Sequence, residues 1–174
     1  MSTTEGFIDG KKTNGWINGS YAGNQKNQFY LNQDGYLFLA PESSDEAFPG
    51  NTRSAAAVDL DLDGKVDLVA NQFRQPPRIL INQQKTTNQF VQLRLTGKGK
   101  NTHAIGATVR ISANGKTVMR QVTGGRGYLS QADTLITAGV GPAKVVDVDI
   151  VWPDGSKSHH AALPTNKRHA LQEP

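Results

Sequence analysis

The sequence predicts an all-β protein. Across its 174 residues, apolar and polar residues alternate in short runs, whereas the i, i+3, i+4 spacing of an amphipathic helix is nearly absent. Glycine, asparagine and proline bound these runs, and the pairs Asp34-Gly35, Asn114-Gly115 and Asp154-Gly155 are typical of tight hairpin turns. An apolar fraction of 36% in a chain of this length is enough to bury a core.

The alternating runs predict strands in both halves of the chain. In the first half we expect strands at Gln28–Leu31, Tyr36–Ala40, Ser54–Asp59, Val66–Ala70 and Arg78–Asn82. In the second half we expect them at Gln89–Thr96, Ala107–Ala113, Lys116–Thr123, Thr134–Ala138, Val145–Trp152, Lys157–Ala162 and Arg168–Gln172. Because Asn114-Gly115 separates two of these runs by two turn residues, we expect the flanking strands to form a hairpin.

The chain is expected to have two parts. Tyr30-Leu31-Asn32-Gln33 recurs as Leu80-Ile81-Asn82-Gln83, displaced by 50 residues, which suggests blade-like repeats of several short strands. The polar stretch 83–88 that follows is typical of a linker. We therefore predict a blade-like segment over residues 1–87 and a β-sandwich over residues 88–174.

Composition narrows the function classes. The absence of cysteine excludes disulfides, thiolate zinc sites and cysteine nucleophiles. No apolar run approaches the roughly 20 residues of a membrane span, and residues 1–6 do not have the pattern of a signal peptide. The second half is basic, with 11 Lys/Arg against 5 Asp/Glu, but these residues are scattered and no recognition motif accompanies them. We therefore expect no nucleic-acid binding.

One motif carries distinctive chemistry. In the segment 59–67, aspartates occupy loop positions 1, 3, 5 and 9 and glycine occupies position 6; the aspartates are Asp59, Asp61, Asp63 and Asp67. Calcium takes six to eight oxygen ligands, which a coiled loop with alternate side chains pointing inward can supply. Lys65, at position 7, would contribute its backbone carbonyl. Four neighbouring carboxylates repel one another unless a cation neutralises them, so the alternative of a solvated acidic turn is less favoured.

The loop is not an EF-hand. Position 12 of an EF-hand loop is a bidentate glutamate, and here it is Ala70. The apolar runs 55–58 and 68–70 on either side are too short for flanking helices, so we expect the loop to lie between strands.

Other candidate sites are weaker. His159 and His160 are adjacent on an expected strand, so they point to opposite faces and cannot chelate one metal together. Asp147 and Asp149 alternate with apolar residues, as on a half-buried strand, with a second weak cation site as the alternative.

Catalytic and sugar-binding patterns are also weak. No Gly-x-Ser-x-Gly elbow is present, so a serine hydrolase is unsupported. Trp152 most simply enters the core at the end of a strand, although an exposed Trp152 together with Tyr128 could stack on a sugar.

Two segments resemble known families. Asp59–Asp67, with the following 68–71 and 78–82, resembles an FG-GAP or VCBS repeat of the integrin-type propeller. The second half resembles the ASPIC/UnbV domain through the segments 88–95, 104–109, 124–131 and 151–155. This order resembles the C-terminal end of cartilage-acidic-protein-like (CRTAC-type) proteins. The resemblance implies calcium at Asp59, Asp61, Asp63 and Asp67 with the Lys65 carbonyl, an extracellular or cell-surface setting, and no known catalysis.

The favoured function is that of a non-catalytic, calcium-stabilised β module for adhesion, scaffolding or protein interaction, with an unidentified protein or glycan partner. A carbohydrate-binding module and an accessory domain of an enzyme are the alternatives. Aromatic residues make up only 7% of the chain, which disfavours an aromatic sugar platform, and no convergent acid, base or nucleophile can be identified. Because the exposed strand edges of an incomplete propeller must be covered, and self-packing needs no partner, we expect a monomer in preference to an oligomer.

Overall fold

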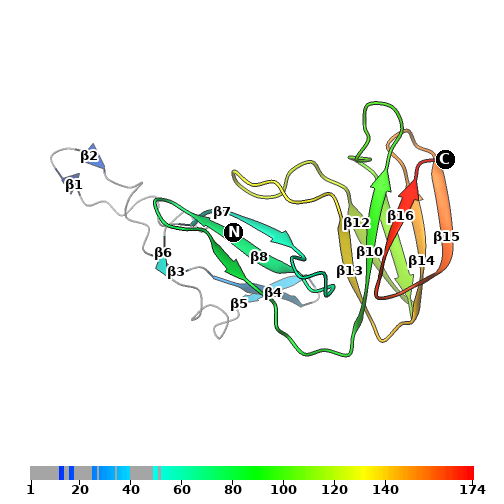
Figure 1. Ribbon diagram of the computed structural model, residues 1–174, viewed down its shortest axis with the longest axis horizontal. Coiled ribbons are helices and arrows are strands. Elements are labelled where there is room, and N and C mark those ends of the chain that lie inside the picture. Colours follow the sequence, from blue (N-terminus) through cyan, green and yellow to red (C-terminus); the bar gives the residue numbers. More distant parts are fainter. Residues whose placement is uncertain are drawn as a thin grey trace. The chain divides into compact units, whose positions relative to one another are not determined.

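The computed structural model describes residues 12–13, 16–17, 25–26, 28–33, 35–39, 49–50 and 52–174. Within these residues the chain consists of strands, turns and loops with no helix, which confirms the predicted all-β class (Figure 1). The strands form several separate sheets, none of them closed. No helix in this part of the chain is long and apolar enough to cross a membrane.

Every strand expected from the sequence is found, with ends shifted by up to a few residues. In the first half the strands are β1 (Lys12–Thr13), β2 (Trp16–Ile17), β3 (Gln25–Lys26), β4 (Tyr30–Gln33), β5 (Tyr36–Leu39), β6 (Pro49–Gly50), β7 (Thr52–Val58), β8 (Asp67–Gln72) and β9 (Arg78–Leu80). In the second half they are β10 (Gln89–Thr96), β11 (Thr108–Ala113), β12 (Lys116–Gln121), β13 (Ile136–Gly141), β14 (Val145–Val151), β15 (Lys157–Pro164) and β16 (Lys167–Gln172). Strands β1, β2, β3 and β6 were not predicted, because two residues are too few to show an alternating pattern.

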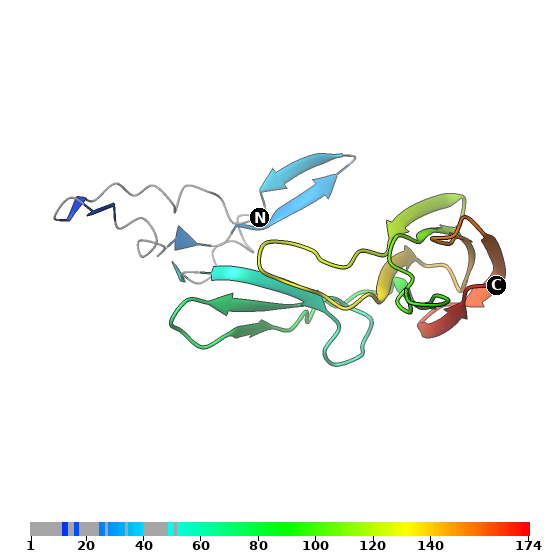
Figure 2. The same cartoon turned by 90° about the horizontal axis from the view of Figure 1, so that it is seen from above.

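The sheets are small and mostly antiparallel. The second half contributes a three-stranded sheet of order β13-β10-β16 and a four-stranded sheet of order β12-β11-β14-β15. The first half contributes the sheet β7-β8-β9 and the pairs β1-β2, β3-β6 and β4-β5, the last visible as two blue arrows in Figure 2. Within the larger sheets of the second half, β10 and β16 pair in parallel, and both arrows point the same way in Figure 1.

The chain divides into two compact units that interleave along the sequence. The second unit comprises residues 57–68, 80–126 and 131–174, and the other described residues belong to the first. The aspartate loop 59–67 is predicted as part of the blade-like segment, and in the structure it lies in the second unit. The predicted boundary between residues 87 and 88 concerns a different property, namely where a part of the chain that folds on its own begins. That boundary stays a prediction.

The core of the second unit is built from alternate residues of its strands. On β14 the apolar residues are buried and Asp147 and Asp149 are exposed, as expected for a half-buried strand. The two larger sheets and their connections contribute side chains to one cluster, which consists of Val91, Leu93, Leu95, Ala104, Ala107, Val109, Ile111, Val122, Ile136, Ala138, Val146, Val148, Ile150, Trp152 and Leu171. Every member lies within residues 88–174.

Turn chemistry closes the hairpin between β11 and β12 as the sequence predicts. Asn114 and Gly115 have φ values of 49° and 74°, the left-handed conformation that a two-residue type I′ turn requires. They join β11 to β12, which pair in register from Thr108↔Gln121 to Ala113↔Lys116.

The asparagines of the repeated four-residue motif, Asn32 and Asn82, also share a local role. The side-chain oxygen of Asn32 accepts a hydrogen bond from the amide of Gly35, and that of Asn82 accepts one from the amide of Gln84.

An ion pair extends from the face of β10 opposite the core. The guanidinium of Arg94 donates to both oxygens of Asp133 at 2.6 Å, which holds the pKa of that carboxyl below its ordinary value. Since the folded-state pKa is lowered, the pair stabilises the fold at neutral pH, and this contribution is lost as the pH falls through that pKa.

Because the buried cluster lies entirely within residues 88–174, we expect a fragment of these residues to fold alone. Its chemical unfolding, followed by circular dichroism, is expected to be a single cooperative transition. A fragment of residues 57–174 should be more stable, because it also includes the loop. A molten or insoluble 88–174 fragment would show that its core needs the preceding segment.

Candidate metal centre

The aspartate loop connects the end of β7 to the first residue of β8. Its bend depends on Gly64, which is buried and has a φ of 85°. A Cβ atom at this position would overlap the ring of Phe90 on β10, so a side chain here would require that ring to shift and would also strain the backbone. Leu62 also has a positive φ, 62°, so the loop is tightly coiled on both sides of Asp63.

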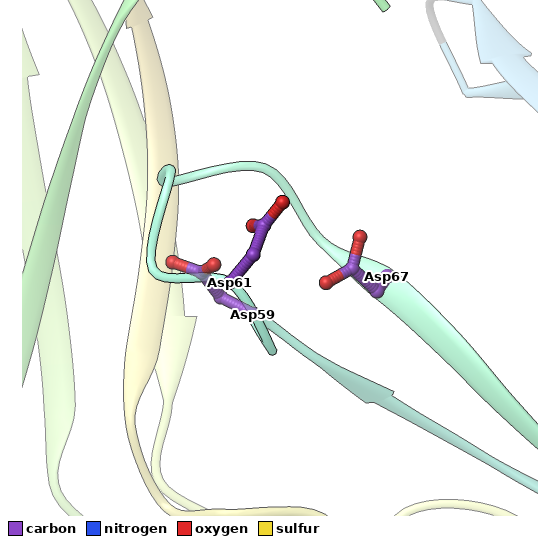
Figure 3. A group of neighbouring side chains, drawn as sticks. All are labelled: Asp59, Asp61 and Asp67. Atoms are coloured by element: carbon purple, nitrogen blue, oxygen red, sulfur yellow. The ribbon is translucent and has the colours of Figure 1, made fainter. Parts of the chain in front are cut away.

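The loop gathers three of the four predicted aspartates. Asp59, Asp61 and Asp67 each offer a carboxylate oxygen, and these oxygens all lie within 4.8 Å of one another. Figure 3 shows Asp59 and Asp61 on the stretch that follows β7, with Asp67 at the start of β8. Asp67 is buried, with 1% of its surface exposed, whereas Asp61 is exposed and Asp59 is partly buried.

Backbone amides hold two of these carboxylates in place. Asp67 accepts from the amide of Leu60 and from the amide of Asn82, both at 2.8 Å. Asp59 accepts from the amide of Asp63 at 3.1 Å and from the amide of Gly64 at 3.0 Å. Hydrogen bonds of this kind fix the orientation of the two carboxylates before any ligand arrives.

The fourth aspartate is not brought into this group. The carboxylate of Asp63 forms an ion pair with the ammonium of Lys65 and also accepts from the amide of Lys65. The ammonium lowers the pKa of Asp63, and Asp63 in turn raises the pKa of Lys65. Of the five predicted ligands, the structure therefore clusters the carboxylates of Asp59, Asp61 and Asp67, and places the Asp63 carboxylate against the side chain of Lys65.

The donor set suits a hard cation. Three carboxylates supply oxygen alone, with no nitrogen or sulfur ligand in the cluster, which is the preference of calcium and magnesium and differs from that of zinc or copper. Each oxygen of Asp67 uses one of its lone pairs on a backbone amide, so each retains another for a ligand. The residues present thus fit a divalent cation of this class.

Sequence reasoning missed the residues that surround Asp59. Gln92 on β10 donates from Nε2 to Oδ2 of Asp59 at 2.6 Å, and its own oxygen accepts from Nε of Arg168 at 3.2 Å. Nothing in the strand pattern singles out Gln92, because it alternates with core residues as an ordinary outward-facing polar residue would. Its burial, with 3% of its surface exposed, was the unexpected feature.

The weaker candidates gain little from the structure. His159 pairs across the sheet with Asp149 and His160 with Val148, so their side chains lie on opposite faces, as predicted. His159 Nδ1 lies 2.7 Å from Asp149, and Asp147 accepts from the amide of Ala162. Among the described residues, these groups do not join a cluster of three metal-ligating side chains.

The pair proposed to stack on a sugar is not available as a pair. Trp152 is 2% exposed, and its Nε1 donates to the hydroxyl of Ser158 at 2.9 Å. Tyr128 is 69% exposed. The structure therefore supports the prediction that Trp152 lies in the core, and the alternative of an exposed Trp152 platform is wrong.

Comparison with known proteins bears on the second unit. No curated protein matches the chain. The aspartate loop and β10 precede the segment that a family model recognises, so the resemblance of the loop to an FG-GAP or VCBS repeat stays a prediction. In agreement with the resemblance inferred from the sequence, residues 97–174 match the family model ASPIC and UnbV.

Proposed function

We propose that the protein is a calcium-binding, non-catalytic β module for adhesion, scaffolding or protein interaction. The observation that carries the proposal is the group of three aspartate oxygens within 4.8 Å of one another, one of them from a buried side chain. A bound cation stabilises such a group, because its attraction to the carboxylates outweighs their repulsion of one another. The ion would be structural, holding the loop between β7 and β8.

The ligands would be Asp59, Asp61 and Asp67, with Asp63 and the Lys65 carbonyl completing the set. To bind calcium, the carboxylate of Asp63 would first have to leave the ammonium of Lys65. The ammonium and the calcium ion would therefore compete for this carboxylate. Calcium is favoured over magnesium because it tolerates irregular coordination by several carboxylates, whereas magnesium demands near-ideal octahedral geometry and retains water.

The proposal extends to architecture and setting through family resemblance. The first segment would be a blade of an integrin-type propeller and the second a β-sandwich, in an extracellular or cell-surface protein with a protein or glycan partner. The match of residues 97–174 to the ASPIC and UnbV model supports the second part of this arrangement. A carbohydrate-binding role is less favoured, because Trp152 is buried.

Calcium is expected to raise the melting temperature of chelator-treated protein, because only the folded loop gathers the ligands. A concentration about 100 times the dissociation constant would add about 2.7 kcal/mol to the free energy of unfolding. The dissociation constant is expected near the extracellular range of about 10⁻⁴–10⁻³ M, or tighter. Asp61→Ala should remove most of the shift.

The matched control is Asp154→Ala, which removes an exposed aspartate outside the loop and should keep the shift. Differential scanning fluorimetry measures the shift, and calorimetric titration measures binding directly. Identical melting curves in calcium and in chelator would contradict the proposal.

A further inference from the structure

The face of β10 that points away from the core meets the aspartate loop. Along this strand Val91, Leu93 and Leu95 enter the core, so Phe90 and Gln92 point to the other side. The ring of Phe90 lies against Gly64, and the amide of Gln92 is bonded to Asp59. This contact explains why a polar residue on the face opposite the core is almost fully buried.

The orientation of the Gln92 amide is fixed by its two partners. Asp59, when ionised, can only accept a hydrogen bond, and the guanidinium of Arg168 can only donate. The amide therefore has one arrangement that satisfies both, with its oxygen toward Arg168 and its NH₂ group toward Asp59. Arg168 lies directly beside Gln92 in the parallel register of β10 and β16.

This arrangement decides which oxygen of Asp59 remains open to a ligand. Oδ2 accepts from Gln92 at 2.6 Å and from the amide of Gly64 at 3.0 Å, which uses both of its lone pairs. Oδ1 accepts from the amide of Asp63 and retains one lone pair. Asp59 is thus prepared to bind a cation through Oδ1.

We infer that Gln92 is a positioning residue for the cation site and that Arg168 sets its orientation. The inference rests on the proposed calcium site and extends it to two strands outside the loop. By linkage, calcium in the loop stabilises the pairing of β10 with β16, and disruption of that pairing weakens calcium binding.

The test is calorimetric titration of the full chain with calcium after chelator treatment. Gln92→Leu keeps a similar volume but removes the amide, and we expect about tenfold weaker binding, as for other residues that orient metal ligands. Arg168→Met removes the donor that anchors the amide oxygen of Gln92, so the amide is held less firmly beside Asp59 and this change should also weaken binding. Simple electrostatics predicts the opposite sign, because loss of a positive charge near an anionic site should tighten cation binding.

Lys167→Met is the matched control, since it removes the same charge from the neighbouring exposed position of β16. It should leave the affinity unchanged or slightly tighter. In the Gln92→Leu background, Arg168→Met should no longer weaken binding, because there is no amide left to orient. Arg168 is exposed, so its substitution carries the test even if Gln92→Leu destabilises the fold.

The outcomes separate the inference from the proposed function. If the wild-type chain does not bind calcium, the proposed function fails and the inference fails with it. If the wild type binds and Arg168→Met binds as tightly as Lys167→Met, the positioning role is overturned while the calcium site stands. Weaker binding by Arg168→Met in the wild-type background, but not in the Gln92→Leu background, supports the inference.

Discussion

Asp67→Ala is expected to destabilise the second unit by about 3 kcal/mol even in chelator, and to abolish calcium binding as well. The buried carboxylate accepts from the amides of Leu60 and Asn82, and alanine would leave both donors without an acceptor. Relief of repulsion with Asp59 and Asp61 acts in the opposite direction. We expect the loss to dominate, because hydrogen bonds to charged groups contribute about 1.5–3 kcal/mol each.

Urea unfolding in chelator, followed by circular dichroism, measures this effect. The matched control is Asp61→Ala, which removes an exposed carboxylate from the same cluster and should leave the metal-free stability within about 0.5 kcal/mol of the wild type. Both variants should lose calcium binding, so only the metal-free measurement distinguishes them. Equal stabilities would show that Asp67 has no structural role of its own.

Trp152→Ala is expected to cost about 4 kcal/mol, because it removes the largest buried side chain of the second unit and leaves a cavity. It also leaves the hydroxyl of Ser158 without its indole partner. Trp152→Phe retains most of the apolar volume, so its cost should be clearly smaller. Since the substitution removes a fluorophore, urea unfolding should be followed by far-ultraviolet circular dichroism.

The control for this prediction is Val151→Ala, at the exposed neighbouring position of β14. A small surface change there should alter the free energy of unfolding by about 0.5 kcal/mol or less. If Trp152→Ala unfolds at the same urea concentration as Val151→Ala, the indole contributes little to the core.

Local patterns predicted the strands well because each strand carries its own signal. The alternation in Gln89–Thr96 gave both ends of β10, and Asn114-Gly115 gave the turn between β11 and β12. Strand β13 extends to Gly141 instead of Ala138, since its pairing with β10 continues, with an irregularity, to Gln89↔Gly141. Pairing partners of this kind are tertiary and leave no mark on the local pattern.

The candidate site was predicted less completely for a related reason. The spacing of the aspartates identifies the loop, because the coiling of nine residues is a local property. It does not reveal that Asp63 pairs with Lys65, nor that Gln92 and Arg168 reach the same site. The contacts of Gln92 and Arg168 depend on where β10 and β16 lie, and in the sequence these two residues are 76 positions apart.

The parallel pairing of β10 with β16 has a consequence for the order of events on the ribosome. Strands β11 and β12 are consecutive in the sequence, so they can pair soon after β11 has been synthesised. Strand β10 can pair with β16 only after the whole segment between them has been synthesised. At about 5–20 residues per second, translation of the intervening segment takes roughly 4–15 s. During that interval Arg168 has not been made, so the amide of Gln92 lacks the second of its two partners. A nascent chain is therefore expected to acquire its full affinity for calcium only after β16 has emerged, late in the synthesis of this domain.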